Sequence, residues 1–410
     1  MKIAVWHNLP SGGGKRALYY HVQGLVERGH YVESWCPPTA GQTYLPLSNL
    51  VKENIVALPQ KTTQLFSPLN SWLASYNRII DQLVALDAHC QQCAAAINDA
   101  GFDILFANSS TLFYNNPMGR YTKLPSLIYL QEPYRWLYEA LPQLPWVALD
   151  NPSAPKLTLS FLKSFLGDSI KVQGLRVQMR EELKNAKAFD RILVNSQYSR
   201  ESVLRAYGLE SEVCYLGIDT DLFLPVQQPK ESYVVGLGGI YAGKRIERAI
   251  ESIATIPTPQ RPPLIWIGNF VDTDYLEKID SLAKALKVSF ITKVRLSDSD
   301  LAKTLSSAAV MIYTPFLEPF GFAPLEANAC GTPVVAIAEG GVRETVQNGI
   351  NGYLTPDYNP SQLGAAVMKL VSDQNLAKTM GLRSRQLVLD QWNLASAIDR
   401  LEKKLLALVN

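Results

Sequence analysis

Short apolar runs alternate with longer amphipathic stretches along the whole 410-residue chain. The short runs, rich in Val and Ile, predict strands, and the longer stretches predict helices. Strands that alternate with helices form parallel sheets covered on both faces. The predicted strands are Ile3–Trp6, Tyr31–Trp35, Ile104–Ala107, Leu127–Leu130, Ile192–Asn195, Tyr233–Leu237, Leu264–Ile267, Val288–Ile291, Val310–Tyr313 and Val334–Ile337. They fall into two sets, so we predict an α/β chain with two doubly wound, Rossmann-like parallel-sheet domains.

The break between the two sets lies near 216–230, where Gly217, Pro225 and Pro229 interrupt the periodic pattern. The length of the chain is also typical of two domains. We therefore predict a first domain over residues 1–216, a second over 217–392, and a terminal amphipathic helix over 393–410.

Composition excludes several classes of protein. Apolar residues make up 47% of the chain and charged residues 19%, which is too apolar for a disordered protein. The net charge of +2 does not indicate a polyanionic partner, and the sequence contains no recognised nucleic-acid-binding module. The N-terminus lacks the pattern of a signal peptide, and no apolar run is long enough to span a bilayer, so we expect a cytoplasmic protein.

The cysteines are scattered and odd in number, which indicates reduced thiols. They are Cys36, Cys90, Cys93, Cys214 and Cys330. Only the Cys90–Cys93 pair, after His89, has the spacing of metal ligands. A zinc site there would need a second pair of ligands, so we expect no metal at this place.

The loop after the first predicted strand carries three glycines, Gly12–Gly14, and leads into a predicted helix. Glycines expose main-chain N–H groups to a ligand, and the start of a helix favours negative charge. The loop matches neither a Walker A motif nor the dinucleotide fingerprint. It predicts an anion-binding turn, and a flexible turn without a ligand is the alternative.

A second glycine loop, 238–245, follows the strand Tyr233–Leu237. Its last residues, Lys244 and Arg245, stand where a helix begins, which is unfavourable for cations. A bound anion, such as a diphosphate, would compensate them. Two solvated surface charges are the alternative interpretation.

The most informative segment is 315–326, which follows the strand Val310–Tyr313. Gly321 allows a tight turn, and Pro324 favours the first turn of a helix. Glu318 on the loop and Glu326 in the helix offer two carboxylates to hydroxyl groups of a sugar and a ribose. A carboxylate pair for acid–base catalysis, as in a glycosidase, is an alternative, but the neighbouring phosphate-type loops favour a phosphorylated ligand.

This segment resembles the family-4 retaining glycosyltransferases (group 1) of the GT-B fold. Further matching segments are the N-terminal glycine loop, Asn195–Ser199, Leu216–Phe223, Ala329–Ala336, Gly340–Gly341 and Asn348–Leu354. The resemblance implies two domains that face a cleft, with the C-terminal helix crossing back to the first. It also implies that residues 1–216 hold the acceptor and residues 217–392 the nucleotide sugar.

The resemblance assigns a role to each candidate residue. Glu318 and Lys244 would be catalytic, with Glu318 on the transferred sugar and Lys244 on the diphosphate. The remaining donor-binding candidates are Gly13, Gly14, Gly239, Arg245, Phe320, Gly321, Phe322 and Glu326, the last on the ribose. The implied reaction is front-face transfer of a hexose from a UDP- or GDP-linked donor to a glycan, lipid-linked or small-molecule acceptor.

The sequence departs from the family pattern at two places. Gly239 stands where the family has an Arg, and Arg245 is the candidate replacement. Gln131 and Glu132 follow the strand Leu127–Leu130, where the family often has a His near the sugar. We place these two residues on the acceptor or sugar side of the site.

Three Asp-x-Asp triplets, at 219–221, 272–274 and 298–300, predict turns and helix caps rather than a metal on the diphosphate. We therefore expect neither a metal nor any other cofactor. The stretch 156–187 combines seven cations with apolar residues. It predicts either peripheral contact with an anionic membrane at its inner face or a helix packed on the first domain with a solvated basic face.

Two other functions stay open at this point. The first is a nucleotide-sugar epimerase on the same fold, and the second is a non-catalytic module that binds nucleotide sugars. The residues do not identify the sugar, the base or the acceptor.

Overall fold

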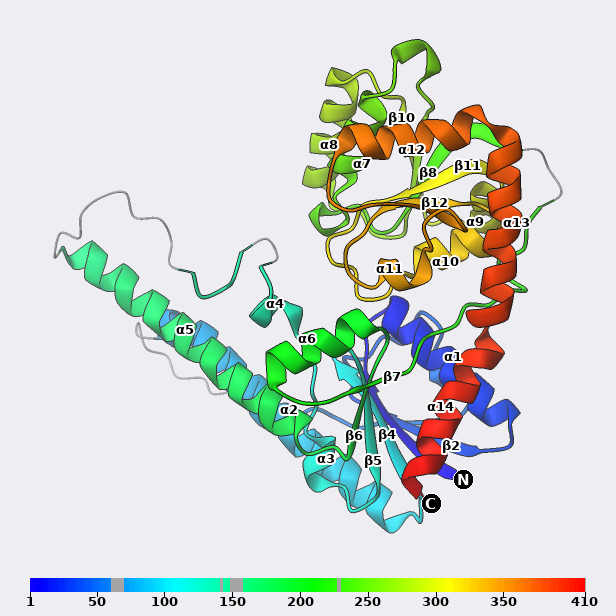
Figure 1. Cartoon of the computed structure of the whole chain (residues 1–410). Coiled ribbons are helices and arrows are strands. Elements are labelled where there is room, and N and C mark those ends of the chain that lie inside the picture. The colour runs from blue at the N-terminus through cyan, green and yellow to red at the C-terminus, as the bar shows by residue number, and fades with distance from the viewer. Residues whose placement is uncertain (60–69, 141–142, 148–157, 227–229, 410) are drawn as a thin grey trace. The chain divides into compact units, whose positions relative to one another are not determined.

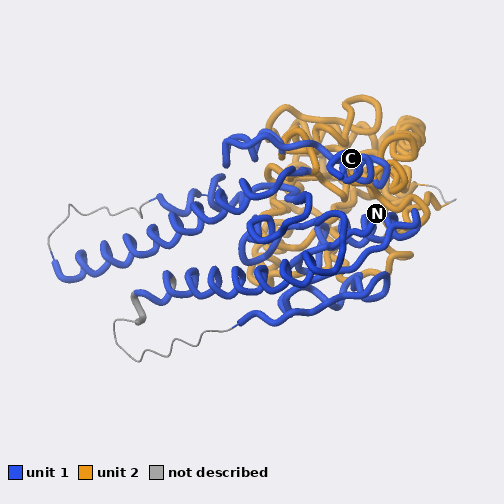
Figure 2. Tube along the Cα trace, turned by 90° about the horizontal axis from the view of Figure 1, so that it is seen from below, with its two compact units in different colours: residues 1–194, 200–214, 398–410 blue, residues 195–199, 215–397 orange. Residues whose placement is uncertain are grey.

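The computed structural model describes residues 1–59, 70–140, 143–147, 158–226 and 230–409. The chain divides into two compact units (Figure 2). Unit 1 comprises residues 1–194, 200–214 and 398–410, and unit 2 comprises 195–199 and 215–397. Each unit contains one parallel sheet with helices on both faces, as predicted (Figure 1).

The elements up to residue 214 are β1 (Lys2–Asn8), α1 (Gly13–Glu27), β2 (Tyr31–Cys36), η1 (Leu47–Asn49), β3 (Lys52–Ile55), α2 (Asn70–Asp99), β4 (Ile104–Ser110), α3 (Met118–Tyr121), β5 (Ser126–Gln131), α4 (Arg135–Tyr138), α5 (Leu159–Ala186), β6 (Arg191–Val194), α6 (Gln197–Tyr207) and β7 (Glu212–Val213). The sheet order is β3-β2-β1-β4-β5-β6-β7, and every neighbouring pair is parallel. The order reverses between β1 and β4, which makes that point the topological switch of unit 1.

The later elements are β8 (Glu231–Leu237), η2 (Ala242–Lys244), α7 (Ile246–Ala254), η3 (Thr258–Gln260), β9 (Leu264–Gly268), α8 (Thr273–Ala285), β10 (Phe290–Val294), α9 (Asp298–Ser307), β11 (Ala308–Tyr313), α10 (Phe322–Ala329), β12 (Val334–Ile337), α11 (Val342–Thr345), β13 (Gly352–Thr355), α12 (Pro360–Ser372), α13 (Gln374–Gln391) and α14 (Leu394–Val409). The parallel sheet of unit 2 has the order β10-β9-β8-β11-β12-β13, with its switch between β8 and β11.

The sequence-based prediction lacks three strands of the structure and places the start of a fourth too early. β3, β7 and β13 were not predicted, and β10 begins two residues after the predicted start at Val288. All four lie at or next to an edge of their sheets. Strands at an edge are partly solvated, so they lack the continuous apolar run by which buried parallel strands are recognised.

His89, Cys90 and Cys93, whose spacing is that of metal ligands, lie in the core of unit 1. Trp6 Nε1 donates to His89 Nε2 at 3.2 Å, and Cys90 and Cys93 lie in the same buried apolar cluster. These residues therefore have a structural role in the packing of α2 against the sheet.

The last helix joins unit 1, as the family resemblance implies. A Cβ at Gly24 of α1 would lie 2.5 Å from Ile398 of α14, so the two helices pack closely. Arg28 donates to Glu402 at 2.5 Å, and His30 pairs with the same carboxylate at 2.7 Å. The end of the chain is thus a part of the N-terminal unit.

The basic stretch of the sequence forms α5, which packs along α2 (Figures 1 and 2). A Cβ at Gly174 of α5 would meet Ile79 of α2 at 2.9 Å. Lys156 lies outside the described residues. Among the described residues, no helix is both long and apolar enough to cross a bilayer.

Candidate functional site

The loops that follow β8, β11 and β12 lie at the same edge of the unit 2 sheet. β8 and β11 are neighbours at the switch point. Open α/β sheets bind ligands at such a point, outside the carboxyl ends of the strands. The candidate site therefore consists of residues 238–245, 314–321 and 338–341.

The loop after β8 holds two cations at the start of α7. Residues 242–244 form the 3-10 turn η2, and Arg245 has the left-handed conformation with φ 49°. The Thr314 hydroxyl lies 3.2 and 3.0 Å from the carbonyl oxygens of Lys244 and Arg245 and donates to them. This contact ties the turn to the end of β11.

Lys244 forms an ion pair with Glu318, and 2.7 Å separate Nζ from Oε2. The exposed fractions are 17% for the Lys244 side chain and 27% for that of Glu318. A pair this exposed contributes about 1 kcal/mol or less to folding. A ligand that offers phosphate oxygens to one partner and hydroxyl groups to the other can therefore displace the pair at low cost.

Arg245 points to other side chains. Its guanidinium stacks 3.8 Å from the centroid of the Phe316 ring, and its NH1 lies 3.4 Å from Oε2 of Glu339. Burial and the neighbouring Arg248 lower the pKa of Arg245, and Glu339 partly offsets them. The family has an Arg at the position of Gly239. That Arg245 takes over the role of this Arg stays a prediction.

Close backbone approach fixes the loop that carries Glu318. A Cβ at Gly340 would lie 2.3 Å from the Glu318 carbonyl oxygen, and one at Gly341 would lie 2.1 Å from that of Pro319. Only glycine fits at both positions. The Gly341 N–H donates to the Glu318 carbonyl at 2.8 Å, and the Ser196 hydroxyl donates to the Pro319 carbonyl at 2.5 Å.

The turn into α10 exposes backbone rather than side chain. Gly321 has φ 90°, a conformation that favours glycine, and α10 starts at Phe322. The Phe320 side chain is buried against Phe322 and Trp392, with ring centroids 5.4 and 5.7 Å apart. Phe320 and Phe322 can therefore serve a ligand chiefly through their main-chain N–H groups.

The two predicted carboxylates flank one buried tyrosine. Glu326 is buried in α10, whereas Glu318 is partly exposed. Burial, and then the charges of Glu318 and Glu326, raise the pKa of Tyr313 well above its ordinary value. The structure thus brings both carboxylates to the carboxyl end of β11.

In unit 1 the structure places Gln131 beside the glycine loop. Gly13 begins α1, and a Cβ at Gly14 would lie 2.9 Å from Nε2 of Gln131. Gln131 ends β5 with φ 67°. Glu132 lies 3.6 Å from Arg135, the first residue of α4.

Sequence reasoning missed Thr314, Phe316 and Glu339, which hold the cationic turn. Glu339 directly precedes the glycine pair at 340–341, and its Oε2 also accepts the Leu317 N–H at 3.5 Å. The only available signal was an acidic residue between a buried strand and two glycines.

The Asp-x-Asp triplets have local structural roles. Asp219 accepts main-chain N–H groups of its own turn, and Asp272 caps α8. The third triplet lies in the first turn of α9, whose cap is Ser297.

A cavity of about 710 Å³ lies elsewhere in unit 2. Lys230, Ser306 and Cys330, which line it, precede β8, β11 and β12. It is therefore at the amino ends of the strands, whereas ligands of open α/β sheets bind at the carboxyl ends. We do not place the functional site there.

Comparison with known proteins agrees with this geometry. Residues 221–387 match the family described as glycosyl transferases group 1. The D-inositol 3-phosphate glycosyltransferase of Corynebacterium jeikeium is 26% identical over 301 residues, which cover 67% of this chain and 70% of that protein. The human α-1,3/1,6-mannosyltransferase ALG2 is 27% identical over 232 residues, 50% of this chain and 55% of that protein. Several other curated relatives are matched over about half of their length.

Solved structures share the fold over the whole chain. The Anabaena protein Alr3699/HepE, solved in complex with UDP, superposes with a TM-score of 0.71 at 17% identity and covers 99% of this chain and 100% of that chain. The sequence-based prediction of two parallel sheets and a C-terminal helix therefore agrees with the structure. The family match over residues 221–387 agrees with the predicted resemblance. Residues 221–387 therefore match the group 1 glycosyltransferases, and the chain as a whole has the GT-B fold.

Proposed function

We propose that this chain transfers a hexose from a UDP- or GDP-linked donor, with retention of configuration, to a glycan, lipid-linked or small-molecule acceptor. The observation that supports this most is the Lys244–Glu318 ion pair at the switch point of unit 2. A nucleoside diphosphate sugar offers phosphate oxygens to the ammonium and sugar hydroxyls to the carboxylate.

The proposed chemistry is front-face displacement. The acceptor hydroxyl forms a bond to the anomeric carbon on the face from which the diphosphate leaves, and the leaving diphosphate oxygen takes the acceptor's proton. The protein contributes by orienting both reactants and by stabilising negative charge on the diphosphate. We assign this stabilisation to Lys244, to the amides at the start of α10, and to the Gly13–Gly14 amides of unit 1.

The other candidate residues bind or orient the donor. Glu326 receives the ribose hydroxyls, and the backbone at 320–322 contacts the sugar and the diphosphate. Arg245 adds positive charge beside Lys244. We place Gln131 and Glu132 near the transferred sugar, where neither supplies an imidazole.

We further propose that transfer needs no divalent metal, because the ammonium of Lys244 and the helix-start amides supply the charge that a metal would provide. A chelator should leave turnover unchanged. Loss of turnover in EDTA, restored by Mg²⁺ or Mn²⁺, would overturn this part of the proposal.

The first donor to test is UDP-glucose, because the structure of the Anabaena protein was also solved with it. Thermal-shift titrations with UDP-, GDP- and ADP-sugars identify the base. Release of the nucleoside diphosphate then measures turnover, and NMR of the glycoside reports its anomeric configuration. An epimerase would instead release an altered nucleotide sugar without any acceptor. A binding module would bind the donor with no turnover.

We also propose that the outer half of α5 contacts an anionic membrane. Leu159, Leu162 and Phe165 are 90%, 52% and 58% exposed. Their spacing puts them on one face of the helix, and Lys163 and Lys171 lie on the same segment. This arrangement suits an enzyme that takes a lipid-linked acceptor.

Co-sedimentation with vesicles of phosphatidylglycerol and phosphatidylcholine tests this contact. We expect binding to the anionic vesicles only, and a Leu162→Ser/Phe165→Ser variant should lose it. Leu382→Ser, which changes an exposed leucine of α13, is the matched control. Equal binding of wild type and variant would remove the hypothesis.

A further inference from the structure

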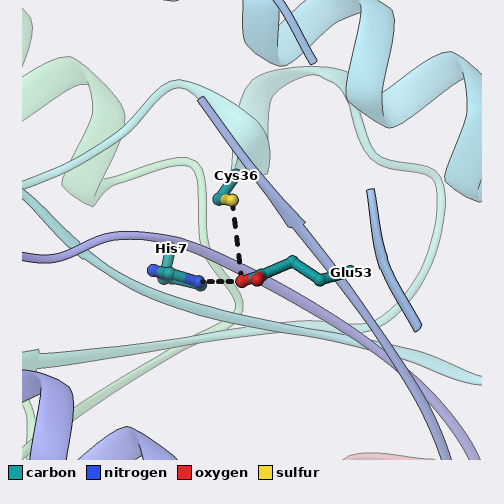
Figure 3. A group of neighbouring side chains, drawn as sticks. All are labelled: His7, Cys36 and Glu53. Carbon is teal, nitrogen blue, oxygen red and sulfur yellow. Dashed lines mark hydrogen bonds and ion pairs between the residues drawn. The ribbon is translucent and has the colours of Figure 1, made fainter. Parts of the chain in front are cut away.

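Three side chains with metal-binding atoms converge inside unit 1 (Figure 3). His7 comes from β1, Cys36 ends β2, and Glu53 lies in β3. His7 Nε2 is 3.1 Å from Glu53 Oε1, and Cys36 Sγ is 3.7 Å from the same oxygen. The ligand atoms of all three residues lie within 4.8 Å of one another.

The cluster is buried and its polar atoms are incompletely paired. The His7 side chain has no exposed surface, and that of Glu53 is 2% exposed. His7 Nδ1 and Glu53 Oε2 are buried without a hydrogen-bond partner. Buried polar groups are normally paired, because an unpaired one costs about 1–3 kcal/mol. His7 Nδ1 is on the side of the ring away from Glu53, but Glu53 Oε2 belongs to the carboxylate that contacts both His7 and Cys36, so this carboxylate can bind a further group.

The two separations that involve Glu53 fit a small tetrahedral cation. Zinc binds Cys sulfur at about 2.3 Å and His nitrogen or carboxylate oxygen at about 2.0–2.2 Å. Tetrahedral angles then separate nitrogen from oxygen by about 3.3 Å and sulfur from oxygen by about 3.6 Å. The observed 3.1 and 3.7 Å differ from these values by a few tenths of an ångström. We propose that His7, Cys36 and Glu53 form a binding site for Zn²⁺.

Lys15 competes with this cation. Its side chain is fully buried, and its Nζ lies 3.5 Å from His7 Nε2. In the metal-free protein the positive charge of Lys15 helps to keep the Glu53 carboxylate ionised. A bound Zn²⁺ takes over that role, and because zinc binds a thiolate, the Cys36 proton passes to solvent.

The zinc site is separate from the donor site of the proposed function. Its ligands come from three strands of unit 1, and none of them is a donor-binding candidate. The sequence-based expectation of no metal rested on the lack of a second pair of ligands with the close spacing of Cys90 and Cys93. These three ligands are separated by long segments of chain, so that search could not find them.

The test uses Co²⁺ as an optical probe and the full-length protein without donor. Wild type should bind one Co²⁺ with a thiolate-to-cobalt charge-transfer band, and Zn²⁺ should displace it. Cys36→Ser, His7→Gln and Glu53→Gln should each weaken binding at least about 100-fold. The matched control, Cys214→Ser, changes another buried cysteine of unit 1 and should bind as wild type does.

A Lys15→Met variant makes the test independent of any ligand variant that fails to fold. Removal of the competing ammonium should tighten Co²⁺ binding about tenfold. If only this variant binds metal, Lys15 is the resident cation and the proposal is wrong. A charge-transfer band that persists in Cys36→Ser would overturn it as well. Turnover does not enter any of these readouts, so failure of the proposed function would not be confused with failure of the zinc site.

Discussion

A Glu318→Gln substitution should separate recognition of the sugar from recognition of the diphosphate. Glu318 is assigned to the sugar, so the variant should bind UDP-glucose more weakly, whereas UDP, which no longer has to break the ion pair, should bind as tightly as before or slightly more tightly. Hydrogen bonds to a charged group contribute about 1.5–3 kcal/mol. In the free protein the carboxylate also holds Lys244 at 2.7 Å, and the donor must break that contact at a cost of about 1 kcal/mol or less. The net loss is therefore about 0.5–3 kcal/mol, or about 2- to 150-fold in affinity.

Titration calorimetry with UDP and UDP-glucose measures this difference directly. If the nucleotide proves to be GDP, GDP and GDP-mannose replace them. Lys244→Met should instead weaken the binding of UDP and of UDP-glucose alike, because both ligands contain the diphosphate. Turnover should fall about 100- to 1000-fold in either variant, a magnitude typical of lost transition-state stabilisation. Asp274→Asn, at an exposed carboxylate of α8, is the control for the loss of charge.

The reasoning is refuted if Glu318→Gln weakens UDP and UDP-glucose equally, or leaves both unchanged. Thermal denaturation excludes a trivial loss of fold. Because the ion pair contributes about 1 kcal/mol or less, the melting temperature should fall by no more than about 4 °C for a unit of this size.

Three further outcomes follow from the packing. Gly341→Ala places a Cβ 2.1 Å from a main-chain oxygen, so the free energy of unfolding should fall by about 1–3 kcal/mol in urea denaturation. Gly167→Ala is the control: its Cβ meets nothing within 4 Å, and it should not destabilise the protein in the same assay. Burial lowers the pKa of His21 to about 3, so below about pH 6.5 the unfolded chain binds a proton that the folded chain does not, and stability should fall by about 2 kcal/mol at pH 5. Burial also lowers the pKa of His7 and His89, so urea melts at pH 8 and pH 5 should show a loss in both proteins that is about 2 kcal/mol smaller in His21→Phe than in wild type. Arg245→Lys keeps the charge and loses the stacking on Phe316, so KM for UDP-glucose should rise about threefold with little change in kcat; an unchanged KM would show that the stacking does not position the cation.

Buried strands were predictable because both of their faces pack against helices. β11, β12 and the middle of β8 (residues 233–236) are buried and read as continuous apolar runs in the sequence. β3 and β13 are different: their sequences, KENI and GYLT, contain few apolar residues, and both are edge strands. Only the pairing with an inner strand makes these segments extended, and that pairing is not a local property of the sequence.

The loops of the candidate site were predictable for a similar reason, and their mutual contacts were not. Gly321 and the glycine pair at 340–341 mark places where the backbone needs positive φ or close approach, and glycine is a visible signal of both. The partner of Arg245 is Glu339, 94 residues further along the chain. The contact between them depends on β8 and β12 lying on either side of β11 in the sheet, and the residue types alone do not indicate that order.

The two cations at the start of α7 suggest how the site couples phosphate to sugar. Each has a carboxylate partner from a neighbouring loop, Glu318 for Lys244 and Glu339 for Arg245. Without these partners two positive charges at the positive end of a helix would repel each other and the helix dipole. A diphosphate that draws Lys244 away leaves Glu318 available to sugar hydroxyls. The two parts of a nucleotide sugar should therefore bind cooperatively, whereas free glucose at millimolar concentration should neither bind measurably nor change the affinity for UDP-glucose.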